Sequence, residues 1–196
     1  MLNWNPDEID LDGDFEKSFF MIYLLHVVGD IHQPLHSCSL LNDQFPEGDR
    51  GGNSMKINFV DDSQITNLHS LWDSVLAADY NDIKHPMSEK TTKIIENEAA
   101  KLMKEFPKAS LSELDTHLRT VDWVKESWTI CKNNVYKGVT MNMKIKKGDA
   151  YMTSNLPIVK KQLALAGYRL SQMLVKVYHA HQKPGQNERR KHLKKE

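Results

Sequence analysis

Apolar residues recur at helical spacing along much of this chain, and polar or glycine-containing turns separate the apolar stretches. The first predicted helix covers residues 15–33 and is apolar nearly all round, with the run FFMIYLLHVV at 19–28. Asp14 can cap its start, and Pro34 ends it because the residue before a proline is pushed out of the helical region. A helix without a polar face is typical of a central, buried element.

Four further helices are predicted from capping residues and apolar stripes. Asn67 and Ser88 are suitable N-caps, and the segment from Ser112 to Asp115 resembles a capping box. Residues 138–154 contain two glycines and are expected to be irregular. The four helices are expected at about residues 67–80, 89–106, 112–136 and 156–181.

One segment alternates with a period of two instead. Met55, Ile57 and Phe59 alternate with polar residues, which predicts one short strand. The turn sequence Asp49-Arg-Gly-Gly-Asn53 precedes it. With no internal repeat in the chain, the pattern predicts an all-α fold with at most one short strand or hairpin.

Charge changes this picture only at the end of the chain. The 196 residues hold 26 basic and 26 acidic side chains, so bulk charge does not indicate binding to nucleic acid or membranes. Residues 183–196 nevertheless hold six basic and two acidic residues, a net charge of +4, with almost nothing apolar. We therefore expect a helical domain over residues 1–182 and a basic, disordered, solvated tail over 183–196.

The apolar run at 19–28 is too short to span a bilayer, which needs about 20 residues. It follows an acidic stretch rather than a basic one, and no small-residue cleavage site follows it, so we do not interpret it as a signal peptide. Two cysteines, Cys38 and Cys131, are too few for a disulfide framework. One bridge and two buried thiols are equally compatible with the sequence, so cysteine usage leaves the compartment open.

Candidate chemistry comes from two histidine–aspartate pairs, His26–Asp30 and His69–Asp73. Each pair has i, i+4 spacing, so on a helix both side chains project from the same face. Imidazole and carboxylate together are ligands that zinc takes in open, catalytic sites. Burying the first pair without a partner would cost several kcal/mol, roughly. A single such pair is more often an ion pair, but two pairs and the additional His36 favour a metal site.

Other polar and aromatic residues near these pairs have plainer interpretations. His32 points away from Asp30 on the helix, so we interpret it as structural, with support of the metal ligands as an open alternative. Asn53, after Gly51 and Gly52, lies where a backbone can approach a substrate closely, although a plain turn explains the glycines equally well. Three tryptophans, Trp72, Trp123 and Trp128, are expected in the core rather than as base-stacking platforms. Two further histidines, His85 and His117, are expected at the surface.

These segments together resemble the S1/P1 nuclease family of zinc-dependent single-strand nucleases and 3′-nucleotidases. The resemblance covers roughly residues 15–178 and implies the helical fold shared by P1 nuclease and bacterial phospholipases C, with three zinc ions in a cleft. It implies hydrolysis of phosphodiesters in single-stranded DNA and RNA, and of 3′-nucleotides, by metal-activated water. The similar stretches are 26–36, 49–53, 67–73, 123–127 with Tyr136, and 166–170.

The resemblance also implies roles for individual residues. His36, His69 and Asp73 match the complete protein ligand set of one zinc ion. His26 and Asp30 match part of a second set, with Asp30 bridging to the third ion as a catalytic residue. Asn53 falls in a matched segment and is a candidate for substrate binding.

The chain departs from the family pattern before His26. The family opens on a zinc-binding tryptophan followed by ligand histidines and an aspartate, whereas no histidine stands among the first 25 residues here, and Trp4 is no substitute. We therefore expect that the amino-terminal third of the fold is missing and that an apolar face is uncovered. The alternatives are a catalytically inactive truncated zinc-binding domain and a phospholipase C-like phosphodiesterase.

The resemblance bears on partners and location as well. Single-stranded nucleic acid or nucleotides are the implied substrates, and no stable protein partner and no membrane span are inferred. The family's usual location implies a secreted or lumenal protein.

Overall fold

A computed structural model describes residues 14–74 and 86–181 of the chain. The predicted tail at 183–196, Trp4, His85 and the expected end of the helix at 67–80 lie outside the described residues. The helices are α1 (Asp14–Ile31), α2 (Leu68–Ser74), α3 (Glu89–Glu105), α4 (Glu113–Thr116), α5 (Thr120–Ile130) and α6 (Ala150–His181). Shorter turns of helix are η2 (Pro34–Ser37), η3 (Lys108–Ser110) and the π-helical η4 (Cys131–Val135), and the strands are β1 (Ile57–Phe59) and β2 (Met143–Ile145).

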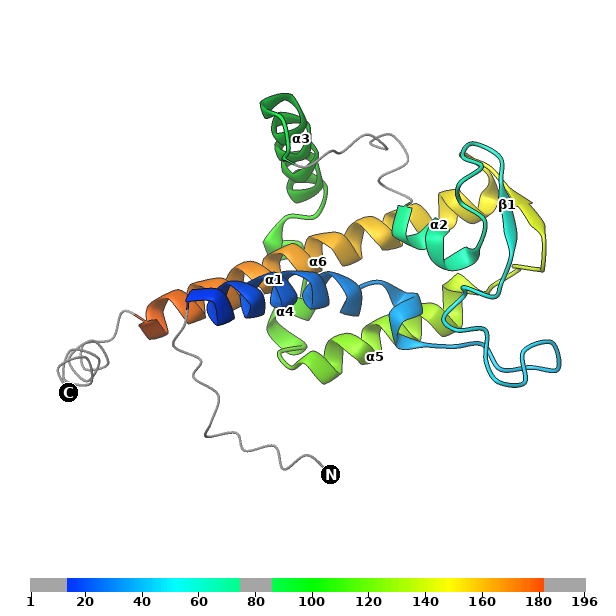
Figure 1. The fold of residues 1–196 in the computed structure, drawn as a ribbon, viewed down its shortest axis with the longest axis horizontal. Coiled ribbons are helices and arrows are strands. Elements are labelled where there is room, and N and C mark those ends of the chain that lie inside the picture. Colours follow the sequence, from blue (N-terminus) through cyan, green and yellow to red (C-terminus); the bar gives the residue numbers. More distant parts are fainter. Residues whose placement is uncertain (1–13, 75–85, 182–196) are drawn as a thin grey trace.

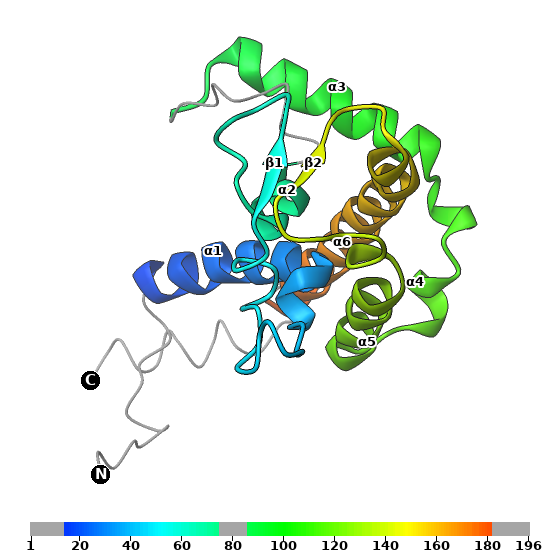
Figure 2. The same cartoon turned by 90° about the vertical axis from the view of Figure 1, so that its right-hand side faces the viewer.

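The longest helix, α6, is the element on which the others assemble (Figure 1). α1, α4 and α3 contact it along its length, and α5 packs against η2 and α1. In Figure 2, α3 lies apart from α1 and α5, across α6, and the two strands lie beside α2. Among the described residues, no helix is both long and apolar enough to cross a membrane.

The structure confirms the all-α class and most of the predicted helices. Ser88 caps α3 by accepting a hydrogen bond from the backbone of Thr91, and the Asn67 side chain accepts one from the backbone of Ser70. The predicted strand also forms, with Ile57 and Phe59 buried. It belongs to no hairpin, because it pairs in parallel with β2, which lies within the segment expected to be irregular.

Two predicted boundaries were wrong. The helix expected at 112–136 is divided into α4, α5 and η4. Asp122 accepts hydrogen bonds from the backbone and guanidinium of Arg119 and so starts α5 anew, while the Trp123 indole donates to the carbonyl of His117 at the break. The last helix begins at Ala150, six residues before its expected start. Pro157 does not end it, although proline removes a backbone donor.

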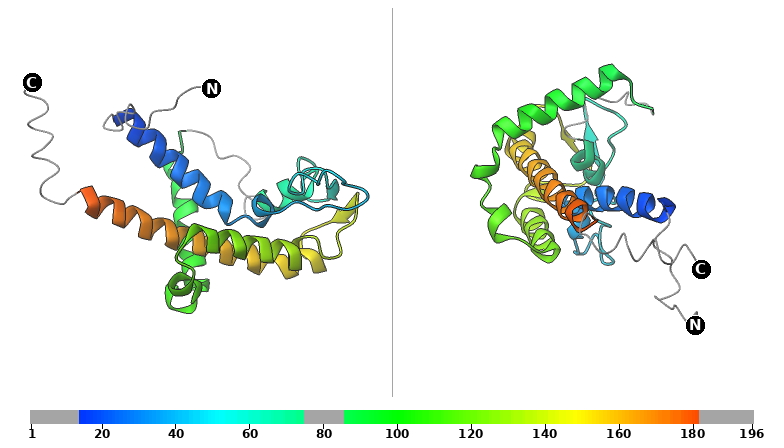
Figure 3. Two further views of the ribbon diagram at one scale, coloured as in Figure 1. Left: turned by 90° about the horizontal axis from the view of Figure 1, so that it is seen from below. Right: turned by 90° about the vertical axis from the view of Figure 1, so that its left-hand side faces the viewer.

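The prediction that the first helix is central and buried was also wrong. Figure 3 shows that the C-terminal end of α1 lies near α6, whereas the N-terminal end of α1 diverges from α6. A helix that is apolar on all sides needs neighbours on all sides, and within the described residues α1 has them only at its C-terminal end, near the buried Val28. The uncovered apolar face that we expected is therefore present on α1: Phe19, Phe20, Ile22, Tyr23 and Leu25 are each more than 40% exposed.

The main core lies at the other end of α1, where η2, α2 and the two strands meet. It includes Leu35 from η2, Phe59 from β1, Leu71 from α2 and Ile145 from β2, all almost fully buried. A disulfide joins Cys38, just after η2, to Cys131, the first residue of η4 after α5. The alternative of two free thiols is thereby excluded, and the bridge ties the loop that follows η2 to the helical scaffold.

Candidate metal centre

Three predicted ligands converge between η2 and α2. One ligand atom from each of His36, His69 and Asp73 lies within 4.8 Å of the other two. The His69 Nε2 atom is 3.4 Å from Asp73 Oδ2, and the His36 Nε2 atom is 4.0 Å from Asp73 Oδ1. The structure thus brings together a residue that follows α1 and two from a helix more than 30 positions away.

The glycine pair at 51–52 allows this convergence. Gly51 and Gly52 have φ angles of 62° and 82°, in the region that favours glycine. A Cβ atom on Gly51 would lie 2.5 Å from the carbonyl oxygen of Leu35, so no other residue allows the loop to approach η2 so closely. The glycines therefore form the turn and also allow the loop to pack closely against η2.

The same loop orients His69. The Nδ1 atom of this ring lies 2.7 Å from the carbonyl oxygen of Gly51. Since a carbonyl only accepts, Nδ1 carries the proton and the Nε2 lone pair is left to bind a metal. Backbone carbonyls hold many metal-binding histidines in this way.

A buried carboxylate anchors the loop from beneath. Asp49 is fully buried and accepts hydrogen bonds from the backbone of Leu40 and the hydroxyls of Ser39 and Tyr136. Burial and the Asp49 carboxylate raise the pKa of Tyr136 far above its usual value, so its hydroxyl remains a donor. From the sequence, Asp49 is predicted only as a turn residue. An acidic residue followed by a pair of glycines was the available signal, but its partner, Tyr136, lies 87 residues away.

The other predicted pair does not acquire a third ligand. His26 Nε2 and Asp30 Oδ2 lie 3.1 Å apart on α1, with side chains 70% and 37% exposed. Among the residues that the structure describes, no other group of three histidine, cysteine or acidic side chains gathers as His36, His69 and Asp73 do. His26 and Asp30 are thus an exposed pair that contact each other, and the cost of burying them without a partner does not arise.

Asp30 nevertheless lines the same cavity, of about 210 Å³, as two members of the three-ligand group. Asp30, His36 and Asp73 line this cavity together with the apolar side chains of Val159 and Leu163 from α6. A larger cavity, of about 450 Å³, lies between α5 and α6. It offers no comparable ligand set, because ion pairs engage its acidic residues: Glu113 with Lys161, Asp122 with Arg119, and Glu126 with Arg169.

His32 is structural, as predicted. Its Nδ1 donates to the carbonyl of Val28 at 2.7 Å, and its Nε2 accepts from Arg169 at 2.8 Å. Neither ring nitrogen is left for a metal. Burial lowers the pKa of His32 to about 4, which keeps the ring neutral.

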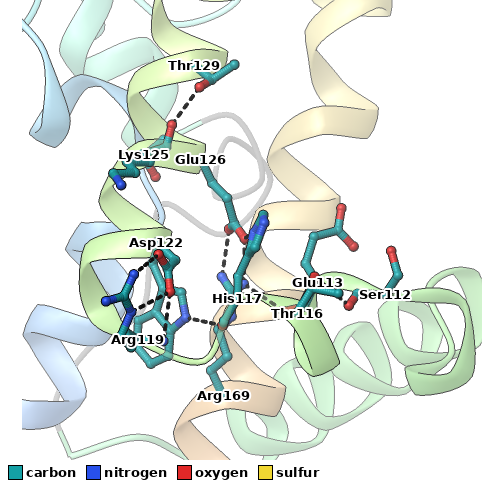
Figure 4. A network of polar contacts seen from close by, with 12 residues as sticks. Ser112, Glu113, Thr116, His117, Arg119, Asp122, Lys125, Glu126, Thr129 and Arg169 are labelled. Carbon is teal, nitrogen blue, oxygen red and sulfur yellow. Dashed lines mark hydrogen bonds and ion pairs between the residues drawn. The ribbon is translucent and has the colours of Figure 1, made fainter.

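Arg169 lies in a stretch that resembles the family, but the sequence alone predicts no role for it. Its side chain organises the polar network of Figure 4. Its guanidinium makes two hydrogen bonds, of 2.7 and 2.8 Å, to the carboxylate of Glu126, and it stacks on Trp123. His117 approaches the same carboxylate and is partly exposed. The network fixes the C-terminal end of α1 to α5 and α6, so that Asp30 lies on the best-supported part of its helix.

The tryptophans and Asn53 have mixed outcomes. Trp72 is buried and donates to the hydroxyl of Tyr151 at 2.8 Å, and Trp123 is also in the interior. Trp128 is 49% exposed, contrary to expectation, because the face of α5 that carries it points away from the core. Asn53 donates to the carbonyl of Arg50 in its own turn, so its assignment to substrate stays a prediction.

Comparison with known proteins gives a consistent set of matches. The sequence profile of the family described as S1/P1 Nuclease matches residues 10–179. Endonuclease 3 of Arabidopsis thaliana is 30% identical over 167 residues, which cover 83% of this chain and 52% of the relative. Endonuclease 4 of the same plant is 30% identical, over 81% of this chain and 50% of the relative. Nuclease S1 of Aspergillus oryzae is 25% identical, over 78% and 52%. The chain spans about half the length of the curated relatives it matches.

Proposed function

Because the chain belongs to the S1/P1 nuclease family, we propose that it acts in the zinc-dependent hydrolysis of phosphodiester bonds in single-stranded DNA or RNA and of 3′-nucleotides. The observation that carries the proposal is the convergence of His36, His69 and Asp73, two of which, His36 and Asp73, line a cavity. The names of the relatives, endonucleases and Nuclease S1, favour a nucleic-acid substrate over a phospholipid.

The donor set fits zinc. Open zinc sites take three protein ligands, commonly imidazoles with a carboxylate, and leave a fourth position for water or substrate. His69 offers Nε2 because its Nδ1 is engaged by Gly51, and Asp73 lies within 4.0 Å of both imidazoles. His36 is exposed and lines the cavity, so the group is open to solvent.

When bound, zinc supplies a hydroxide nucleophile at neutral pH and neutralises charge on the phosphate. Asp30 faces the same cavity, and its carboxylate can accept a proton there or, together with His26, hold a further cation. Val159 and Leu163 line the same cavity and give it an apolar surface against which a base or sugar can pack. These roles make Asp30 the proposed catalytic residue, and Asn53 the proposed substrate contact at the neighbouring turn.

One observation favours a second candidate, a zinc-binding domain without activity. Only one complete group of three ligands forms among the described residues, and the His26–Asp30 pair stands apart from it. A single ion would bind phosphate but lack a neighbour to share its water.

A direct assay separates the candidates. The purified chain is incubated with single-stranded DNA, RNA, a 3′-nucleotide and a phospholipid, in chelator and in added zinc. We expect hydrolysis of the first three, restored by zinc after chelation, and its loss in Asp30→Asn with zinc at the three-ligand group retained. Zinc binding without hydrolysis of any substrate would support the inactive domain, and hydrolysis of the phospholipid alone would contradict the nuclease.

We also propose that the protein works in a secreted or lumenal compartment. The Cys38–Cys131 disulfide supports this location, because disulfides persist in oxidising environments and are rare in the cytosol.

A further inference from the structure

Gln33 stands directly before η2, which carries the proposed zinc ligand His36. It follows α1 and precedes η2, with φ −88° and ψ 114°, because the next residue, Pro34, excludes the helical conformation. Gln33 is therefore extended in the turn between α1 and η2, and its side chain reaches Asp73 on α2.

The two ends of the Gln33 amide have different partners. Its Oε1 accepts a hydrogen bond of 2.6 Å from the backbone N–H of Leu35 and so caps η2. Its Nε2 donates a hydrogen bond of 2.9 Å to Oδ1 of Asp73. The partners fix the orientation of the amide, since a backbone N–H only donates and a carboxylate only accepts.

We propose that Gln33 is a positioning residue of the zinc centre: one amide fixes the carboxylate of Asp73 relative to the turn that presents His36. The inference rests on the proposed metal centre. With Oδ1 of Asp73 held by Gln33 and Nδ1 of His69 held by Gly51, each ligand on α2 has one polar atom engaged by the protein. The opposite atoms, Asp73 Oδ2 and His69 Nε2, lie 3.4 Å apart. Contacts of this kind orient ligands and tune affinity in metal sites.

An amide of this length is needed for both contacts. A glutamate at position 33 would retain the cap on η2 but would repel Asp73, and a lysine would donate but could not cap. Asparagine, one methylene shorter, can cap the turn at Leu35, since it is a favoured capping residue. It cannot reach Asp73 at the same time, so it separates the two contacts without changing the charge.

The test measures zinc affinity, by competition with a chromophoric chelator, for the full chain and for Gln33→Asn and Gln33→Met. Gln44→Asn is the matched control, because Gln44 is exposed in the loop after η2. We expect both Gln33 variants to bind zinc about 10–100-fold more weakly than the wild type and the control. The visible spectrum of bound Co²⁺ should change in both, while unfolding of the metal-free chain should show that Gln33→Asn remains folded.

A double-mutant cycle assigns the loss to Asp73. In an Asp73→Ala background, Gln33→Asn should change zinc affinity less than about twofold, because the partner of its Nε2 is absent. A loss as large as in the wild type, or a Gln33→Asn variant that binds zinc normally, would overturn the inference and leave the metal centre standing. A wild-type chain that binds no zinc would overturn the metal centre and the inference together.

Discussion

The two histidine–aspartate pairs have the same spacing but different surroundings. On α1, His26 and Asp30 contact each other on an exposed helix, beside large apolar side chains that face solvent. On α2, His69 and Asp73 lie within 4.8 Å of a third ligand and are held by a loop carbonyl and an amide. Helical spacing therefore produces the pair, whereas long-range packing produces the site.

The difference extends to the helices themselves. α2 is only seven residues long, yet Leu68 and Leu71 are fully buried and fix it to the main core. α1 is 18 residues long, but its N-terminal half meets little of the described chain. Helix length and apolar content are thus poor guides to how firmly a helix holds its ligands.

The largest expected difference between the two pairs is in zinc affinity after one histidine is removed from each. His69→Ala should weaken zinc binding by about 4 kcal/mol, roughly 1,000-fold, since it removes one of three ligands from a site whose binding energy is shared among them. His26→Ala should leave zinc at the three-ligand group unchanged. Elemental analysis and chelator competition measure both, and equal zinc in wild type and His69→Ala would contradict the assignment.

A smaller effect, on the pH dependence of stability, is expected at His32. This residue follows α1 and lies where the exposed helix joins the packed part of the molecule. Its pKa is lowered from 6.5 to about 4 by burial, so the unfolded chain binds the proton more tightly than the folded chain. The free energy of unfolding should therefore fall as the pH decreases from about 6.5 to about 4, by about 3 kcal/mol for this residue.

The measurement is urea unfolding of the metal-free protein at several pH values, for the wild type and His32→Gln. The difference between the two proteins isolates His32, because other titrating groups contribute equally to both. A difference that stays constant from pH 7 to pH 4 would show that His32 does not cause the loss.

The smallest expected effects are changes in the free energy of unfolding after substitution of two glycines, Gly51 in the loop beside η2 and Gly29 on α1. Gly51→Ala should cost about 1–3 kcal/mol, because the new Cβ atom meets the carbonyl of Leu35 and the φ angle is positive. Gly29→Ala on α1 meets nothing within 4 Å and should stabilise the helix by about 0.5–1 kcal/mol. Thermal unfolding of the two variants checks both signs. A destabilised Gly29→Ala would mean that α1 is packed more closely than its exposure indicates.

Much of the local structure could be predicted from sequence because its causes are local. Pro34 ends α1, Ser88 caps α3, and Ile57 and Phe59 alternate into a buried strand. The break between α4 and α5 escaped prediction, since it depends on an indole of α5 reaching back to a carbonyl before it.

The candidate site divides in the same way. The sequence by itself determined the two ligand pairs, the family and the glycine turn, because spacing, side-chain chemistry and backbone conformation act over a few residues. Only the tertiary structure decided that Asp49 binds Tyr136, that Gln33 binds Asp73, that the cysteines pair and that α1 is exposed. These contacts join residues far apart in the chain, and their geometry depends on how every intervening element packs.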